Sequence, residues 1–440
     1  MRGALGPESI IFQHIFIMEL ANCFGLIRGK YIGEPPLYVD KTRPPGMTEL
    51  PKPTILGWIR NAPFVLINSP NFVWAVISLV TYAYAPYDLS INSSAALAPL
   101  SYRFISERLP IWFSLVFGYF SFWHIALYGF HLASRPFIAD RPYNTDKVIH
   151  NAFWTSSGIV IWTAFENVFC YLWATGRLSY ISNADSFTSL FGIYRFVAAL
   201  MLVPLWRSMH FYFAHRFLHY KPLYQQVHSL HHRNTDIEPF SGLCMHPVEH
   251  LYYFACVMPS LFFLCSPYAF LWNGVHLLLS PAASHSGYED HFQSDIFHYL
   301  HHRFFECNYA GSDAAFMDIA FGTFRGSLED EPKPREDSKS SLRLVPTGEF
   351  VSYLLLSGAC VSPWFFVKIE SQTYAIILSS LAGFGPVLLA TVMSSMYRGS
   401  AGVERVKMNF WGNFLHIVFG ICFCSIPITY AAYLTISPPT

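Results

Sequence analysis

Histidine is concentrated in one part of this 440-residue sequence, where 14 of the 19 histidines lie between residues 210 and 302. The first pair, His215 and His219, has the spacing HxxxH. In a helix of about 3.6 residues per turn, side chains four residues apart leave the same face. Because imidazole nitrogen is a common metal ligand, this spacing indicates a chelating pair.

Two copies of the motif HxxHH follow this pair. Their spacings of three and four residues again place the rings along one face of a short helix. The HxxxH motif supplies two imidazoles and each HxxHH motif three, so the three motifs supply eight, enough for two metal ions with several nitrogen ligands each. The spacing therefore predicts two neighbouring metal sites. The HxxHH histidines are His228, His231, His232, His298, His301 and His302.

Three other histidines are interpreted as additional candidate ligands. His246 and His250 repeat the HxxxH spacing, with Pro247 where a helix start favours proline. His285 lies thirteen residues before His298. His210 and His291 are not expected to bind metal directly. The isolated histidines are interpreted as ordinary core or interfacial residues: His14, His124, His131, His150, His276 and His416.

The composition predicts that these motifs lie in a membrane protein. The sequence is 53% apolar and only 13% charged, against about 25% charged residues in a typical soluble domain. Its 28 basic and 28 acidic residues give a net charge of zero. This balance gives no indication of a nucleic-acid partner.

Apolar segments long enough to cross or nearly cross a bilayer predict an all-α, polytopic membrane helix bundle. A further run, 251–279, is interrupted by Pro259, Ser266 and Pro267, which favours two half-length helices that enter and return. The expected spans are 72–85, 111–133, 153–174, 190–206, 349–369, 374–393 and 411–433.

Basic residues are enriched before the first expected span and in the connection after the second, which predicts that these segments face the cytosol. Four spans then return the chain to the cytosolic side, where the histidine motifs begin. The metal site is therefore expected to face the cytosol. The predicted parts are a cytosolic segment 1–70, transmembrane helices 71–189, a catalytic core 190–326, a polar linker 327–348 and transmembrane helices 349–440.

The identity of the metal is less constrained, because imidazole suits zinc, copper, nickel and iron. Structural zinc is disfavoured, since such sites use four ligands with cysteine prominent and the nine cysteines include no CxxC pair. Soluble di-iron bundles use Glu together with Glu-x-x-His. The excess of nitrogen ligands in a lipid setting fits a non-haem iron pair that binds dioxygen.

At these motifs the chain resembles the fatty acid hydroxylase and sterol desaturase superfamily, which is marked by HxxxH, HxxHH and a later HxxHH on membrane helices. The resemblance covers about residues 190–325. It extends to the flanking sequences HHRNTDIEPFSGLCMHPVEH, HSGYED and HHRFFECNYAGSDAAFMDIAFGTF. The three apolar segments after Glu349 depart from the familiar members, and they are interpreted mainly as membrane anchorage, with an extended lipid cavity or an oligomer contact as alternatives.

The resemblance implies a di-iron oxygenase of the endoplasmic reticulum, with O2 as co-substrate and electrons from cytochrome b5 or a similar separate carrier. The eight motif histidines are then the expected catalytic ligands. Ligand histidines need partners on their second ring nitrogen, for which nearby polar residues are candidates, with Asn308 and Asp318 preferred. The candidates are Glu238, Glu249, Asp290, Asp295, Asn308, Asp313 and Asp318.

Two ionisable residues lie within the expected spans, Glu166 and Arg195, and a structural ion pair between them is the favoured interpretation. For the whole chain, the leading hypothesis is hydroxylation or desaturation of a lipid, with a sterol-like substrate slightly favoured. Conversion of a long-chain aldehyde to a hydrocarbon is the alternative enzyme. A non-catalytic lipid-binding membrane protein is the alternative from another class.

Overall fold

The computed structural model describes residues 101–325 and 369–437 apart from short gaps, together with Ile77 and Val80. The segment 1–70, nearly all of the expected spans 72–85 and 349–369, and the linker 327–348 therefore lie outside the described residues. The gaps within the two described ranges are 134–135, 139–142, 183–184, 186–187, 262–265, 289–293, 312–313, 370 and 397–409.

The described residues form helices joined by short connections, and their one β-type pairing is an isolated bridge between Pro136 and Tyr288. The predicted all-α class is confirmed. The α-helices are α4 (Tyr102–His124), α5 (Thr145–Ala174), α7 (Leu190–Leu218), α8 (Lys221–Gln226), α9 (Pro247–Phe254), α10 (Pro267–Ser284), α11 (Ser294–Phe304), α12 (Ala315–Ala320), α14 (Gln372–Met396), α15 (Phe410–Gly420) and α16 (Ile426–Ile436). Shorter 3-10 and π-helical segments are η1 (Ile125–Gly129), η2 (His228–Arg233), η3 (Pro239–Leu243), η4 (Ala255–Leu261) and η7 (Ile421–Ser425).

The long helices begin at side chains that cap them. Ser101, Asn144 and Ser189 each accept a hydrogen bond from a backbone N–H in the first turn of α4, α5 and α7, respectively. Such caps satisfy N–H groups that have no partner within the helix. Local capping residues thus set the helix starts. The expected spans 111–133 and 153–174 begin several residues after α4 and α5 begin, whereas the expected span 190–206 begins where α7 begins.

Three helical stretches in the described part of the chain are long and apolar enough to cross a membrane: Tyr102–Gly129, Gln372–Ser394 and Phe414–Ile436. They coincide with the expected spans 111–133, 374–393 and 411–433. The expected spans 153–174 and 190–206 form α5 and α7 but are not among these three. In α5 the reason is composition, because the helix buries several polar residues, including Asn151, Thr163 and Glu166.

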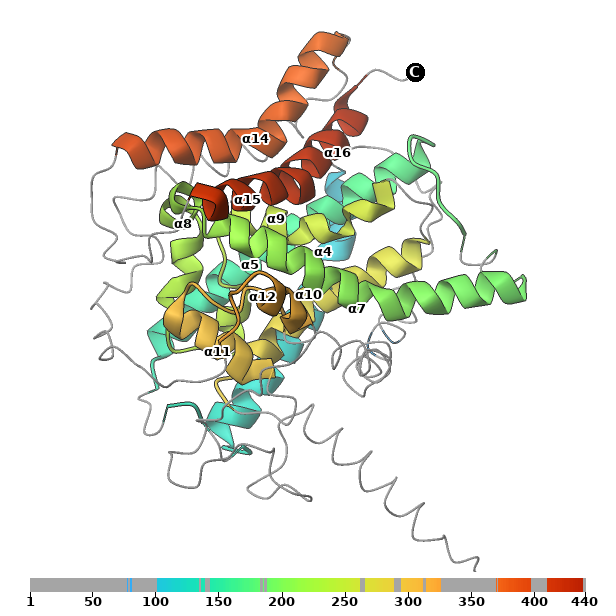
Figure 1. Ribbon diagram of the computed structural model, residues 1–440. Coiled ribbons are helices and arrows are strands. Elements are labelled where there is room, and N and C mark those ends of the chain that lie inside the picture. The colour runs from blue at the N-terminus through green and yellow to red at the C-terminus, as the bar shows by residue number, and fades with distance from the viewer. Residues whose placement is uncertain are drawn as a thin grey trace, which may run out of the picture.

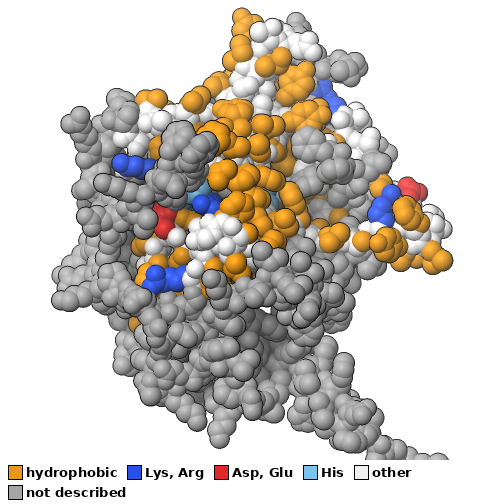
Figure 2. Space-filling view, in the orientation of Figure 1, with side chains coloured by type: hydrophobic (Ala, Val, Ile, Leu, Met, Phe, Trp, Pro, Cys, Tyr) orange, Lys and Arg blue, Asp and Glu red, His pale blue; other side chains and the backbone are white. Residues whose placement is uncertain are grey.

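The carboxyl-terminal helices present an apolar outer face. Exposed side chains of α14 include Ile376, Ile377, Leu388 and Val392. Figure 2 shows hydrophobic side chains gathered over the upper part of this view, where α14, α15 and α16 lie in Figure 1. A contiguous apolar surface of this kind marks contact with lipid or with another apolar surface. With the three apolar helices, it makes the protein a membrane protein.

The interrupted run 251–279 forms α9, η4 and α10, as its prolines and serine predicted. Ser266 caps α10 by accepting from the Ala269 N–H, and Pro267 occupies the first helical position. Nearly every described side chain of α10 is buried. This segment is therefore part of the centre of the bundle, where it packs against α7 and η3.

The carboxyl-terminal helices join the same bundle as the histidine motifs. In Figure 1, α15 and α16 run in line above α7, whose amino-terminal end projects from the bundle. A Cβ atom built at Gly420 of α15 would lie 2.0 Å from the Phe217 ring of α7, so only glycine permits this close approach. Helix α15 therefore packs directly on the part of α7 that carries His215.

The ionisable residue of α5 has a different partner from the one expected. The Glu166 carboxylate, fully buried, accepts from Arg108 Nη2 at 2.6 Å and from Trp112 Nε1 at 2.6 Å. Arg195 is exposed, and its guanidinium lies over the Phe191 ring. The predicted Glu166–Arg195 pair is wrong. Glu166 pairs with Arg108 across the α4–α5 interface, whereas Arg195 is exposed on α7.

We predict that Glu166→Ala lowers the free energy of unfolding by about 3–5 kcal/mol, because it leaves Arg108 at the α4–α5 interface without its carboxylate. Unfolding in mixed micelles measures the change. Glu107→Ala is the control, since Glu107 pairs with Arg103 on an exposed surface and such pairs contribute about 1 kcal/mol or less. Equal effects of the two substitutions would contradict a structural role for the buried pair.

Candidate metal centre

Nine buried histidines form two groups whose ligand nitrogens lie within 4.8 Å of one another in each group. They come from the last two turns of α7, from η2, from the end of α10 and from α11. Eight are the histidines of the three motifs, and the ninth is His285. The first group is His215, His219, His228, His232 and His301, and the second is His231, His285, His298 and His302.

Each HxxHH motif contributes to both groups. In η2, His228 and His232 belong to the first group and His231 to the second. In α11 the assignment is reversed, since His298 and His302 belong to the second group and His301 to the first. The two groups therefore share both helices, and this is the neighbouring pair of sites that the spacing predicted. The second motif lies on a 3-10 helix rather than an α-helix.

Within each group, three Nε2 atoms form a close triangle. In the first group, His232 Nε2 lies 3.1 Å from both His219 Nε2 and His301 Nε2. In the second, the distances among the Nε2 atoms of His285, His298 and His302 are 3.1, 3.1 and 3.2 Å. Two nitrogens that bind one ion at about 2.1 Å lie roughly 3.0–3.4 Å apart for bond angles of about 90–110°. The spacing in both triangles fits a shared ion.

The second ring nitrogens show which way the lone pairs point. His215, His285 and His301 donate from Nδ1 to the carbonyl oxygens of Tyr309 at 2.9 Å, Pro281 at 3.0 Å and Cys307 at 2.6 Å. A carbonyl oxygen only accepts, so Nδ1 carries the proton and a neutral ring presents an Nε2 lone pair inward. His215 Nε2 has no hydrogen-bond partner among the described residues. Several converging lone pairs in a dry interior fit a metal cation.

Carboxylates face two further rings. Glu249 Oε1 lies 2.7 Å from His228 Nδ1, and Glu306 Oε1 lies 3.7 Å from His219 Nδ1. A carboxylate at the second nitrogen orients a ligand imidazole and increases its basicity. Glu249 was among the candidates from the sequence. Glu306 was not, and its only sequence signal is its place four residues after His302.

Asn308 and Asp318, the preferred candidates, act on the backbone rather than on the rings. Asp318 accepts from the N–H groups of Tyr309 and Ala310, both at 2.9 Å. Asn308, at a φ of 50°, donates to the Phe297 and Arg325 carbonyls. The two residues fix the turn whose Cys307 and Tyr309 carbonyls accept from ligand histidines. Asn308 and Asp318 therefore hold the backbone of this turn, and the carbonyls of the turn orient the His215 and His301 rings.

The other candidates lie elsewhere or outside the described side chains. Glu238 hydrogen-bonds to His124, not to a histidine of either group. Asp290 and Asp313 lie outside the described residues, as does the side chain of Asp295.

The structure does not bring His246 and His250 into either group. His246 is the N-cap of α9, where its Nδ1 accepts from the Val248 N–H at 3.1 Å. The His250 ring stacks on Phe254 and lies against Gly158 of α5. Capping of α9 occupies the His246 ring, and packing between Phe254 and α5 occupies the His250 ring, so their HxxxH spacing does not bring them together with the other histidines.

Burial controls the charge of the centre. It lowers the pKa of His231 to about 4, and the pKa values of His232, His301 and His302 lie well below the usual range for the same reason. The rings are therefore neutral near pH 7, which is the form that binds metal. Burial raises the pKa of Glu249 well above its usual range. A cation in the first group would oppose that shift by favouring the carboxylate.

The wall of the first group includes residues that sequence reasoning missed. Tyr309 lies edge-on to His215 and His219, and its hydroxyl donates to Glu306. Arg216, directly after His215, hydrogen-bonds to His416 of α15. The carboxyl-terminal helices thus contact the residues that surround the metal ligands, a link of 200 residues in sequence that no local pattern could reveal.

Comparison with known proteins agrees with this geometry. Residues 200–323 match the fatty acid hydroxylase family. The chain is 30% identical to methylsterol monooxygenase 1 of Gallus gallus over 31% of this chain and 48% of that protein. It is 25% identical to a Delta(7)-sterol 5(6)-desaturase of Gibberella zeae over 30% of this chain and 42% of that protein. It is 37% identical to a very-long-chain aldehyde decarbonylase of Oryza sativa over 29% of this chain and 53% of that protein.

The chain spans about half the length of these curated relatives. No solved structure matches it. The matched segment contains every histidine of both groups. By name, two of these relatives are a sterol monooxygenase and a sterol desaturase, and the third is an aldehyde decarbonylase. Through residues 200–323, the chain is similar to the fatty acid hydroxylase and sterol desaturase superfamily.

Proposed function

We propose that this protein is a membrane-bound di-iron oxidoreductase that uses O2 to hydroxylate or desaturate a lipid. The observation that carries the proposal is the convergence of nine buried histidine side chains into two adjacent nitrogen-rich groups. Two groups that share the same two HxxHH motifs suit two ions that act together. Iron is preferred over zinc because the donor set is rich in nitrogen and contains no cysteine.

Iron bound in both groups would supply reduction of dioxygen and removal of hydrogen from an unactivated lipid C–H bond, which acidic and basic side chains cannot perform. The chain's own residues prepare for that chemistry. The carbonyls of Tyr309, Pro281 and Cys307 hold three rings in the ligating tautomer. The ligands are at most 5% exposed, so the surrounding helices exclude water.

The reaction requires an external source of electrons. Hydroxylation consumes one O2, two electrons and two protons for each alcohol formed, with one water as the second product. Desaturation consumes the same reactants and forms two waters. Cytochrome b5 or a similar separate carrier is the proposed donor. The endoplasmic reticulum membrane, with the metal site toward the cytosol, is the proposed location, in keeping with the basic residues of the flanking segments.

A sterol-like lipid is the favoured substrate class, supported by the methylsterol monooxygenase and sterol desaturase relatives. The alternative reaction, aldehyde to hydrocarbon, is supported by the decarbonylase relative. A lipid-binding protein without turnover is the third hypothesis, and the complete ligand set argues against it. Deletion of the gene followed by profiling of sterols, sphingolipids and wax precursors separates the three. An accumulating sterol precursor supports the favoured class, and an accumulating aldehyde supports the alternative.

We predict that the purified protein contains close to two iron ions per chain, and that His301→Ala or His231→Ala, one from each group, removes most of the iron and the activity. Metal analysis and product formation provide the measurements. His210→Ala is the control, because His210 is a buried histidine of α7 that hydrogen-bonds to the Phe423 carbonyl and belongs to neither group. Full turnover by protein that contains no metal would end the proposal.

We predict that Glu249→Gln weakens iron binding by roughly 10–100-fold, because the amide is a poorer acceptor than a carboxylate for the His228 Nδ1–H. Competition with a soluble chelator measures the affinity without relying on turnover. Glu107→Gln, at the exposed end of α4, should leave the affinity unchanged. An unchanged affinity in Glu249→Gln would mean that this carboxylate does not orient a ligand.

A further inference from the structure

A cavity of about 270 Å³ shares backbone segments with the second histidine group. Gly287 and Tyr288 line it and lie two and three residues after His285. Tyr299 also lines it and directly follows His298, so their Cα atoms lie about 3.8 Å apart. The cavity therefore adjoins the segments that carry ligands, although none of the nine histidines lines it.

The walls of this cavity are largely apolar, and Phe137, Ile138, Val148 and Ile237 contribute to them. The Phe137 and Tyr299 rings stack with centroids 4.7 Å apart, which makes one wall rigid. Pockets that enclose a whole drug-sized ligand measure about 300–1,000 Å³. A cavity slightly below that range suits one end of a lipid, whose remainder extends outside it.

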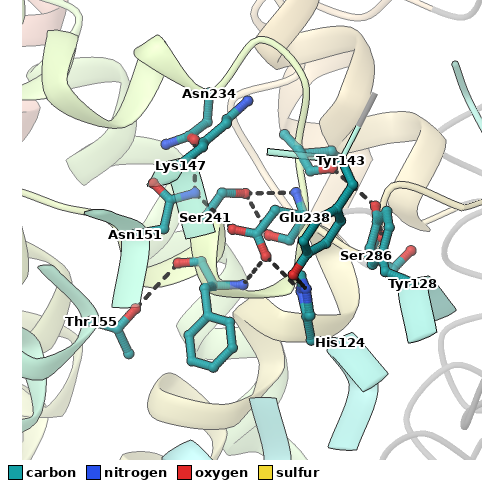
Figure 3. Close-up of polar contacts among 12 residues, drawn as sticks. His124, Tyr128, Tyr143, Lys147, Asn151, Thr155, Asn234, Glu238, Ser241 and Ser286 are labelled. Carbon is teal, nitrogen blue, oxygen red and sulfur yellow. Dashed lines mark hydrogen bonds and ion pairs between the residues drawn. The ribbon is translucent and has the colours of Figure 1, made fainter. Parts of the chain in front are cut away.

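One end of the cavity is polar, and Figure 3 shows the contacts that organise it. Glu238, 2% exposed, accepts from Asn151 Nδ2 at 2.7 Å, from the Phe240 N–H at 3.0 Å and from His124 Nδ1 at 3.1 Å. The other ring nitrogen, His124 Nε2, lies 2.9 Å from the Tyr143 hydroxyl. A carboxylate, an imidazole and a phenol thus form a chain that ends at Tyr143, which is 58% exposed.

This chain leaves Tyr143 one hydrogen bond to offer a ligand. Because Glu238 accepts only, His124 Nδ1 carries a proton. If the ring is neutral, Tyr143 donates to Nε2 and its oxygen can accept from a ligand. If the ring is charged, Nε2 donates to the Tyr143 oxygen and the phenol O–H can donate to a ligand. An alcohol both donates and accepts, so it matches either state.

Lysine among the described residues that line the cavity is matched by a carboxylate. Lys147 Nζ lies 3.9 Å from Asp236 Oδ2 and donates to the Asp236 carbonyl. The Glu238 carboxylate faces the polar end as well. The two carboxylates disfavour an anionic head group such as phosphate or carboxylate. A neutral head group that forms hydrogen bonds meets no such penalty.

The place of the cavity in the bundle points to a lipid. His124 and Tyr128 belong to the last turns of the membrane-spanning stretch Tyr102–Gly129. The end of a span lies near the membrane surface, where amphipathic molecules place their polar end. Tyr128 donates to the Ser286 carbonyl at 2.8 Å, which ties this end of the span to the segment after His285.

We propose that this cavity binds the polar end of a neutral, hydroxyl-bearing lipid, with Tyr143 as the hydrogen-bond partner of its hydroxyl group. This lipid is taken as the substrate, which rests on the proposed function. Its hydroxyl group would be recognised at the end of α4, and its reacting carbon would lie at the histidine groups. Alcohols are therefore the substrate class, with a ring or a chain as the apolar body.

Equilibrium binding to the full-length protein in lipid nanodiscs tests this assignment. The probes are cholesterol and 1-octadecanol, each compared with its methyl ether, which lacks the donor. The wild-type protein should bind at least one of the alcohols roughly tenfold more tightly than Tyr143→Phe does, whichever partner donates. A preference of the wild type for the alcohol over its ether would show that the ligand is the donor. Tyr102→Phe, an exposed tyrosine at the opposite end of α4, should bind like the wild type.

A second variant guards against a folding effect. Val148→Trp fills the cavity and should weaken binding of alcohols and ethers alike, while the melting temperature stays close to that of the wild type. Binding of both alcohols that is unchanged in Tyr143→Phe would overturn the assignment. His301→Ala distinguishes the two proposals, because it should lose iron and turnover but bind the alcohol like the wild type. Retained turnover there would contradict the proposed function alone.

Discussion

The structure depends on how nine buried imidazoles, which face one another in two groups, are kept from repelling one another. Neutral rings whose Nε2 lone pairs converge at about 3.1 Å repel one another in a dry interior. A metal cation is a partner that could satisfy the lone pairs of each group at once. Burial lowers the pKa values of His231 and His301, which disfavours protons in that role. Acceptors on the far side hold the Nδ1 protons of several of these rings: His215, His228, His285 and His301.

Those acceptors explain why the surrounding fold is so specific. The Cys307 and Tyr309 carbonyls follow α11 in a turn that Asn308 and Asp318 hold in place. The Pro281 carbonyl lies in the last turn of α10, where Pro281 also supplies the close contact with Gly242 of η3. Helix α7 carries two ligands at one end and packs on α10 and α15. Because these elements either carry the histidines or bond directly to their rings, a shift of any one of them would move the rings.

The sequence predicted the elements of the site that depend on local spacing and missed those that depend on tertiary contacts. HxxxH and HxxHH indicate neighbours within one or two helical turns, so the eight motif histidines were identified from the sequence. The structure gathers them into two groups, and their role as metal ligands stays a prediction. The same spacing in His246 and His250 misled, because local spacing says nothing about where a helix points. Most partners of the ligand rings are backbone carbonyls, which every residue has and no motif marks. Glu306, His416 and the Arg108–Glu166 pair were likewise invisible, since each meets its partner through chain folding rather than through periodicity.

The segment that matches the family holds both histidine groups, whereas part of the proposed head-group cavity lies before that segment. The segment 200–323 holds both histidine groups and matches a family whose members named here act on sterols and on aldehydes. The polar end of the cavity also needs His124, Tyr143 and Lys147, which lie before that segment on α4, α5 and their connection. The histidine groups tolerate little change, because His215, His285 and His301 each have Nδ1 bonded to a backbone carbonyl while the ring belongs to one of the two groups. The cavity residues outside 200–323 belong to neither histidine group, so under the proposed function recognition of the lipid head group can vary there while the histidine groups stay the same.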